Sequence, residues 1–224
     1  MFPLYDENRS RTFPFITLAL IVVNALVFFW EFMEGFSDNL FLTYGEIPLL
    51  VMNGKQVYTV ITSTFIHVDI LHLFGNMLYL FIFGDNVEDR LGHFKYLVFY
   101  LVFGLVGGFT HSTVAVASGG VDQYIPAVGA SGAIAGVLGT YLVFYPHARI
   151  VSLVPSFFFV RLARVPALIF IGFWFLLQIL YSGGSSSVAY LAHVGGFMVG
   201  LAIAVIFRVL NPKNESGGYR REMR

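Results

Sequence analysis

Six apolar stretches divide the chain, and each approaches the length that a helix needs to cross a bilayer. They lie at about 13–33, 70–88, 94–117, 129–145, 166–182 and 188–208. A spanning helix needs about 20 residues, so the short fourth and fifth stretches are expected to pack inside a bundle. A segment in hydrocarbon must satisfy its own backbone hydrogen bonds. The sequence therefore predicts an all-α, polytopic membrane protein, a bundle of six transmembrane helices.

Composition agrees with a membrane protein. Only 12% of the residues are charged and 57% are apolar, whereas soluble domains carry about 25% charged residues. The formal net charge is zero, so no basic surface indicates a nucleic-acid partner. The chain has no cysteine, which excludes disulfides and thiolate chemistry. We expect a multi-pass integral membrane protein whose surroundings are the lipid bilayer.

The positive charges predict the orientation. Of 13 Lys and Arg residues, all but Lys55 fall in the N-terminal segment, in the second-to-third and fourth-to-fifth connections, or at the C-terminal end. Because loops rich in Lys and Arg stay in the cytoplasm, both termini are predicted to be cytoplasmic. The even-numbered helices then start at the outer face. The compactness of the chain favours a bacterial or archaeal cytoplasmic membrane.

One domain is expected. The connection from Glu34 to Asp69 is too apolar for a solvated linker, so it is predicted to be a long structured outer loop, partly embedded, between the first two helices. We find no internal repeat and predict a single membrane domain over 1–210. The polar segment 211–224 is predicted to be a disordered cytoplasmic tail.

Two polar residues lie at one shallow depth in different apolar stretches, Ser131 and His193. Small residues let membrane helices approach closely, and a serine within hydrogen-bond reach of an imidazole is an activated nucleophile. Alternatively, Ser131 bonds its own helix backbone and His193 bonds a neighbour; these two residues alone leave both interpretations open. The glycines spaced for close helix packing are Gly129, Gly132 and Gly136 beside Ser131, and Gly196 and Gly200 after His193.

A third outer helix end carries hydrogen-bond donors. His72 and Asn76 are four residues apart and share one helical face. Their N–H groups suit an oxyanion, and the backbone N–H groups of Ala130 and Ser131 at a helix start would add to them. Three even-numbered helices would therefore converge on a nucleophile, a base and donors. No acidic residue lies in the outer half of a span, so we expect a dyad; Asp69 or Asp122 could reach the base only from an outer loop.

Other chemistries fit less well. His67, Asp69 and His72 do not have the spacing of a recognised metal site, so neither a metal nor a cofactor is expected. A membrane aspartyl protease needs two intramembrane aspartates, whereas Asp85 and Asp89 lie at the cytoplasmic boundary. A small-solute transporter would favour inverted repeats or broken helices in matching halves, and the sequence shows neither convincingly.

The combined motifs resemble those of the rhomboid family of intramembrane serine proteases, over about residues 13–208. GASG at 129–132 is similar to the family's G-x-S-G nucleophile motif. AHVGGFMVG at 192–200 is similar to its A-H-x-x-G-x-x-x-G, and HLFGN at 72–76 to its H-x-x-x-N. GDNVEDRLG at 84–92 resembles a motif of the cytoplasmic end, which implies structural roles for Glu88 and Arg90.

Two positions depart from the family pattern. Tyr58 and Thr59 stand where a Trp–Arg pair is common in the first outer loop. Ala135 stands four residues after the serine, where some members carry an aromatic residue that stacks on the base. The membrane anchoring of the loop and the way the base is held are therefore expected to differ here.

The resemblance implies a serine endopeptidase that cuts transmembrane segments of single-pass membrane proteins near the extracytoplasmic face. Ser131 and His193 would form the catalytic dyad, with an oxyanion hole from His72, Asn76 and backbone N–H groups. The fifth helix, around 170–180, and the outer loop are candidate gates for substrate. The alternative is a non-catalytic rhomboid-like protein that binds and escorts membrane helices. Nothing in the sequence indicates an oligomeric state.

Overall fold

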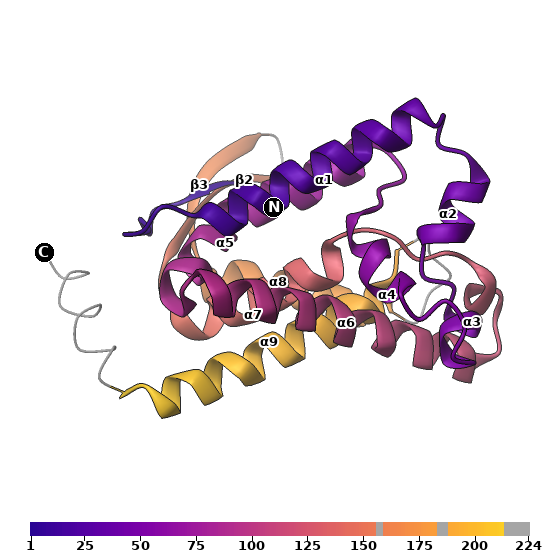
Figure 1. Ribbon diagram of the computed structural model, residues 1–224. Helices are drawn as coiled ribbons and strands as arrows, with labels where there is room; N and C mark the ends of the chain where they lie inside the picture. Colours follow the sequence, from indigo (N-terminus) through magenta and orange to yellow (C-terminus); the bar gives the residue numbers. More distant parts are fainter. Residues whose placement is uncertain (156–158, 183–187, 213–224) are drawn as a thin grey trace, which may run out of the picture.

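The computed structural model describes residues 1–155, 159–182 and 188–212, and its long helices form a bundle (Figure 1). Of the helices in these described ranges, four are long and apolar enough to cross a membrane, and two more are apolar but shorter. This confirms the predicted polytopic helical bundle. The long helices are α1 (Phe15–Met33), α5 (Ile70–Leu91), α6 (His93–Ser118) and α9 (Tyr190–Leu210), and the shorter ones are α7 (Ser131–Phe144) and α8 (Ala167–Tyr181).

The outer connection between α1 and α5 is structured, as predicted. It contains three short helices and a 3-10 turn: α2 (Asp38–Tyr44), α3 (Pro48–Met52), α4 (Thr59–Thr62) and η1 (Ser63–Phe65). A second 3-10 turn, η2 (Val121–Tyr124), follows α6. Glu46 exchanges two backbone hydrogen bonds with Ala127, of 2.9 and 2.8 Å. The loop is therefore fastened to the segment that leads into α7.

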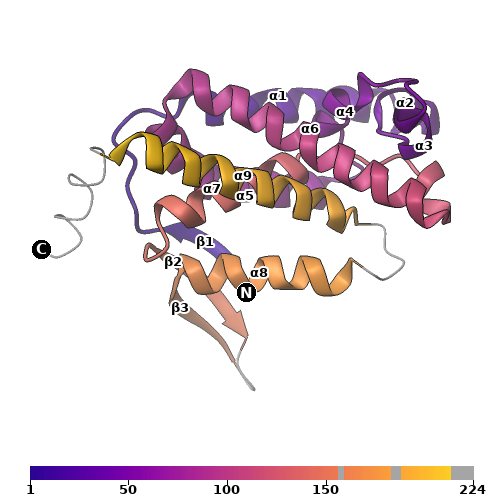
Figure 2. The ribbon, with the colours of Figure 1, turned by 90° about the horizontal axis from the view of Figure 1, so that it is seen from below.

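A three-stranded antiparallel sheet lies at the end of the bundle where α7 ends and α8 begins (Figure 2). The sequence analysis did not foresee it. The strands are β1 (Phe2–Asp6), β2 (Arg149–Pro155) and β3 (Val160–Pro166), in the order β1-β2-β3. The arginines of this connection served only to predict orientation, but they lie among branched apolar residues, which favour strands. Ile150 and Ser152 turn inward and are fully buried.

Helices α7 and α9 make the closest contact in the bundle. The residues of α7 from Gly132 to Tyr141 are all buried. A Cβ atom at Gly196 would collide with the Gly132 carbonyl oxygen, and one at Gly200 with the Gly136 carbonyl oxygen. The two backbones therefore touch, which is the close approach that small residues permit. Thr140 Oγ1 donates to the Gly200 carbonyl across the interface at 3.1 Å.

Glu88 ties three helices together at the C-terminal end of α5. Its buried carboxylate accepts hydrogen bonds from the backbone N–H groups of Ile16 and Thr17, at 2.9 and 2.8 Å, and from Thr17 Oγ1 at 2.7 Å. His93 Nδ1, at the start of α6, lies 2.6 Å away. A carboxylate at the N-termini of α1 and α6 is also favoured by their helix dipoles. The guanidinium of Arg90 lies over the Phe144 ring, 5.6 Å from its centroid.

Asp6 connects the sheet to α7. Its Oδ2 atom accepts a hydrogen bond from Tyr141 Oη at 2.6 Å and from Asn86 Nδ2 at 2.9 Å. Burial raises the pKa of Asp6 to about 7, because the charged carboxylate is poorly solvated there. The first strand is thereby attached to two helices of the bundle. Of the predicted 211–224 tail, residues 213–224 lie outside the described part of the chain.

Candidate active site

Ser131 and His193 meet at the end of the bundle opposite the sheet. Ser131 is the first residue of α7, and His193 lies in the first turn of α9. Ser131 Oγ is 2.7 Å from His193 Nε2, which is hydrogen-bonding distance. His193 is only 8% exposed. The contact requires the close approach of α7 and α9, so the glycines that allow that approach also set the geometry of the pair.

Gly129 shapes the turn that presents Ser131. Its φ angle is +116°, a conformation that residues with a Cβ atom rarely adopt. Its N–H donates to the Ser63 carbonyl at 2.9 Å, which holds the turn against the outer loop. A Cβ atom here would lie 2.7 Å from His72 Nε2 and 3.6 Å from Asn76 Nδ2. The turn before Ser131 therefore lies directly against the two predicted donors of α5.

The donors of α5 are held in place by its N-terminal turn. Asp69 caps the helix by accepting a hydrogen bond from the His72 backbone N–H at 2.7 Å. One N–H of the Asn76 amide donates to the His72 carbonyl at 3.1 Å. An amide carries two such protons, so a second remains for a ligand. Asp69 thus serves as a helix cap, while α5, α7 and α9 bring His72, Asn76, Ser131 and His193 to one place.

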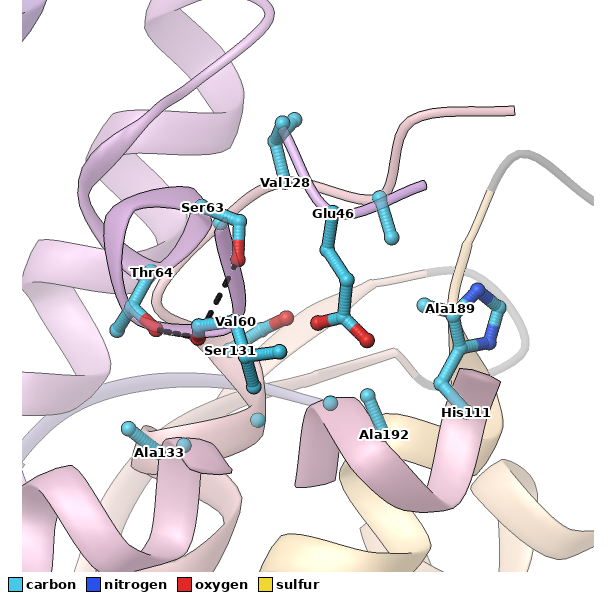
Figure 3. Close-up of a pocket in the computed structure, with 15 residues that line it drawn as sticks. Glu46, Val60, Ser63, Thr64, His111, Val128, Ser131, Ala133, Ala189 and Ala192 are labelled. Atoms are coloured by element: carbon cyan, nitrogen blue, oxygen red, sulfur yellow. Dashed lines mark hydrogen bonds between the residues drawn. The ribbon is translucent and has the colours of Figure 1, made fainter. Parts of the chain in front are cut away.

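A small cavity of about 30 Å³ adjoins Ser131 on the side of the outer loop (Figure 3). The carboxylate of Glu46 points into it, between Ser131 and His111. Ser112 Oγ donates to Glu46 Oε1 at 2.5 Å, and burial raises the pKa of the Glu46 carboxyl group. A water molecule needs roughly 10–15 Å³. The cavity can therefore hold water next to the serine hydroxyl.

Comparison with known proteins identifies the family. The Rhomboid domain family model matches residues 54–209, which is more than half of the chain. The chain belongs to the rhomboid family. The match includes the four sequence motifs around His72, Glu88, Ser131 and His193, so the resemblance noted from the sequence is confirmed.

Curated rhomboid relatives come from bacteria and from mitochondria. RHOMBOID-like protein 12, mitochondrial, of Arabidopsis thaliana is 31% identical over 82% of this chain and 56% of its own length. Rhomboid protease GluP of Bacillus subtilis (strain 168) is 31% identical over 61% of the chain and 25% of its own length. Rhomboid protease AarA of Providencia stuartii is 26% identical over 86% and 72%. The chain thus spans only about half of the Arabidopsis relative and 38% of the mouse presenilin-associated rhomboid-like protein.

Two residues of α8 also contact the His193 ring, and neither contact was expected from the sequence. Gln178 Oε1 lies 2.8 Å from His193 Nδ1. The Trp174 ring lies beside the imidazole, with centroids 5.9 Å apart and planes inclined by 33°. Trp174 thus provides an aromatic contact to His193 that the methyl side chain of Ala135 cannot provide. Gln178 is a polar residue within an apolar helix, and such residues are candidates for function, so that signal was present in the sequence.

The remaining candidates have other partners. His67 is buried, its backbone N–H donates to Glu31 Oε1 at 3.0 Å, and desolvation lowers its pKa to about 4. Tyr58 Oη donates to the Thr43 carbonyl at 3.1 Å, so this hydrogen bond joins two parts of the outer loop. Within the described ranges, no group of three or more His, Asp or Glu residues is arranged to hold a metal ion.

Proposed function

We propose that this rhomboid is an intramembrane serine endopeptidase that cuts single-pass transmembrane proteins near the extracytoplasmic face. The observation that carries the proposal is the 2.7 Å contact between Ser131 Oγ and His193 Nε2. A protein that only binds and escorts helices has no need of a hydroxyl paired with an imidazole. The names of two bacterial relatives, both rhomboid proteases, support the same conclusion.

The reaction would follow the path of serine proteases. Ser131 Oγ attacks the scissile carbonyl carbon while His193 Nε2 takes the hydroxyl proton. The resulting oxyanion lies among the Asn76 amide, the His72 ring and the backbone N–H groups of Ala130 and Ser131 at the start of α7. His193 then passes the proton to the leaving amine, which breaks the peptide bond and leaves an acyl-enzyme.

Hydrolysis of the acyl-enzyme requires water inside the bundle. The cavity beside Ser131 supplies a place for it, since it is lined partly by the polar side chains of Glu46, Thr64 and His111. His193 would again act as the base and would return the proton to Ser131 Oγ. An outer location of this cavity, with both termini in the cytoplasm, is part of the proposal and rests on the distribution of Lys and Arg.

The test is cleavage of a model type I transmembrane segment by the protein in liposomes. Ser131→Ala is expected to lower turnover by roughly 10⁴-fold or more, because the nucleophile is lost. His193→Ala is expected to lose as much, since the two residues act as a unit. A fluorophosphonate should label the wild-type protein at Ser131 and leave Ser131→Ala unlabelled.

The matched control is Ser118→Ala, at the exposed end of α6, which should cleave and label like the wild type. Cleavage by Ser131→Ala at the wild-type rate would rule out the proposed mechanism. Binding of the segment without cleavage by the wild-type protein would instead favour the escort function.

A further inference from the structure

The side of the His193 ring that faces away from Ser131 has a partner of its own. His193 Nδ1 lies 2.8 Å from Gln178 Oε1, and Gln178 is 7% exposed. The amide nitrogen of Gln178 donates to the Trp174 carbonyl at 2.9 Å, one turn earlier in α8. The glutamine therefore joins the backbone of its own helix to the imidazole of another helix.

This arrangement determines which way the Gln178 amide is turned. With its nitrogen on the Trp174 carbonyl, its oxygen faces His193 Nδ1. In the reversed orientation, two oxygen acceptors would face each other at the Trp174 carbonyl and a hydrogen bond would be lost. An amide oxygen only accepts, so Nδ1 must carry the ring proton. Nε2 is then left with its lone pair toward Ser131 Oγ, which is the tautomer that a general base needs.

We propose that Gln178 is a positioning residue that fixes the tautomer and the ring orientation of His193. The proposal rests on the proposed protease function. In serine proteases with a triad, a buried carboxylate performs this task and also stabilises the imidazolium that forms. Gln178 supplies the acceptor without the charge, and a neutral amide costs far less to bury in an apolar bundle than a carboxylate does.

The other titratable groups near the site lie on different elements. His72 of α5 lies against the Gly129 turn, and His111 of α6 lines the cavity next to Ser131. Glu46 of the outer loop points into the cavity next to Ser131. The group next to His193 Nδ1 is therefore the uncharged amide of Gln178, which gives the proposed base a partner besides Ser131.

The test compares Gln178→Leu with Gln178→Glu. Leu has a similar size and no acceptor, so it is expected to lower kcat by about 10- to 100-fold with KM changed by less than about twofold. This loss is smaller than the ~10⁴-fold that follows loss of the correct tautomer in a triad, because Gln178 carries no charge. Fluorophosphonate labelling of Ser131 should slow by the same factor as kcat.

Gln178→Glu keeps an acceptor at Nδ1 and adds a negative charge. It is expected to restore most of the turnover lost in Gln178→Leu. It should also move the acid limb of the pH–rate profile to higher pH, because a carboxylate favours the protonated ring. A residue that served only to fill space would produce neither the rescue nor the shift. The matched control is Gln123→Leu, a glutamine of η2 that is 9% exposed and whose amide nitrogen donates to the Gly120 carbonyl at 3.0 Å.

Three outcomes overturn the positioning role. Gln178→Leu could fold and turn over within about twofold of the wild type. Gln178→Glu could be as slow as Gln178→Leu, or its acid limb could stay in place. Should Gln178→Leu not fold, the profile of Gln178→Glu decides. Ser131→Ala separates the two proposals: if it is inactive while Gln178→Leu is normal, only the role of Gln178 fails.

Discussion

The α7–α9 pair and helix α8 hold the same site by different means. In the pair, backbone lies on backbone, and no Cβ atom fits at Gly196 or Gly200. Helix α8 instead contacts α9 through side chains, with the Phe175 ring stacked on Phe197 at 4.0 Å between centroids. A Cβ atom at Gly172 of α8 would meet nothing. Ser131 and His193 thus lie on two helices packed backbone to backbone, whereas α8 reaches α9 through side chains.

The largest expected effect comes from breaking the backbone contact. Gly200→Val would force its side chain against the Gly136 carbonyl, and overpacking of this kind costs about 3 kcal/mol or more in the worst cases. We expect a lower unfolding temperature in detergent and loss of most of the cleavage activity. Gly172→Val on α8 is the control, because its new side chain enters open space and replaces glycine in a helix.

Equal unfolding temperatures for Gly200→Val and Gly172→Val would contradict the comparison. So would a Gly200→Val protein that unfolds early but keeps full turnover, since the contact between Ser131 and His193 depends on the spacing of α7 and α9.

A smaller effect is expected on α8, where activity and stability should separate. Trp174 lies beside the His193 ring, with centroids 5.9 Å apart, whereas the neighbouring Phe175 stacks on Phe197, with centroids 4.0 Å apart. Trp174→Ala is expected to lower kcat by about 10-fold, because the His193 ring loses the side chain that packs against one of its sides. Phe175→Ala should leave kcat within about twofold while lowering the free energy of unfolding by about 2 kcal/mol, below the value for a fully buried aromatic residue.

Single-turnover kinetics and thermal unfolding of the two variants provide the measurement. If Phe175→Ala loses as much kcat as Trp174→Ala, general loosening of α8 explains both, and the contact of Trp174 with the imidazole has no separate role.

The smallest effect concerns the C-terminal end of α7, where Tyr141 holds β1 through Asp6. The pKa of Asp6 is raised from 3.8 to about 7, so the folded state favours its protonated form. This contribution to stability is fully present below about pH 4 and is lost as the pH rises through about 7. Asp6→Asn should remove that dependence of stability on pH. At pH 8 the unfolding temperatures of this variant and of the wild type should differ by roughly 3 °C.

Unfolding scans between pH 4 and pH 8 test this prediction, with Asp38→Asn, an exposed residue of α2, as the control. An Asp6→Asn protein whose unfolding temperature falls with pH as steeply as that of the wild type would show that another group is responsible.

The helices were predictable because a segment that crosses a bilayer must be apolar and must satisfy its own backbone hydrogen bonds. Each apolar stretch became a helix whose ends lie within a few residues of the prediction, and the glycines beside Ser131 and His193 indicated the close approach of α7 and α9. Similar depth alone left the pairing of Ser131 with His193 open, and the addition of His72 and Asn76 at the same depth favoured it. The family match then agreed with the motifs.

The sheet and the contact of Gln178 with His193 could not be predicted in the same way. The β1–β2 pairing joins residues such as Phe2 and Leu153, and no local pattern specifies a partner so far along the chain. Gln178 stood out as polar, but α8 could have turned any side toward α9. In the structure, the packing of Phe175 on Phe197 fixes which side of α8 faces α9.

The distance along the chain between the strands has a consequence for biosynthesis. Strand β1 is made first, yet its partner β2 leaves the ribosome only after α1, α5, α6 and α7 have been translated. At about 5–20 residues per second, strand β1 waits roughly seven to thirty seconds for its neighbour. Closure of the sheet can therefore occur only after the helix that carries Ser131 has been translated.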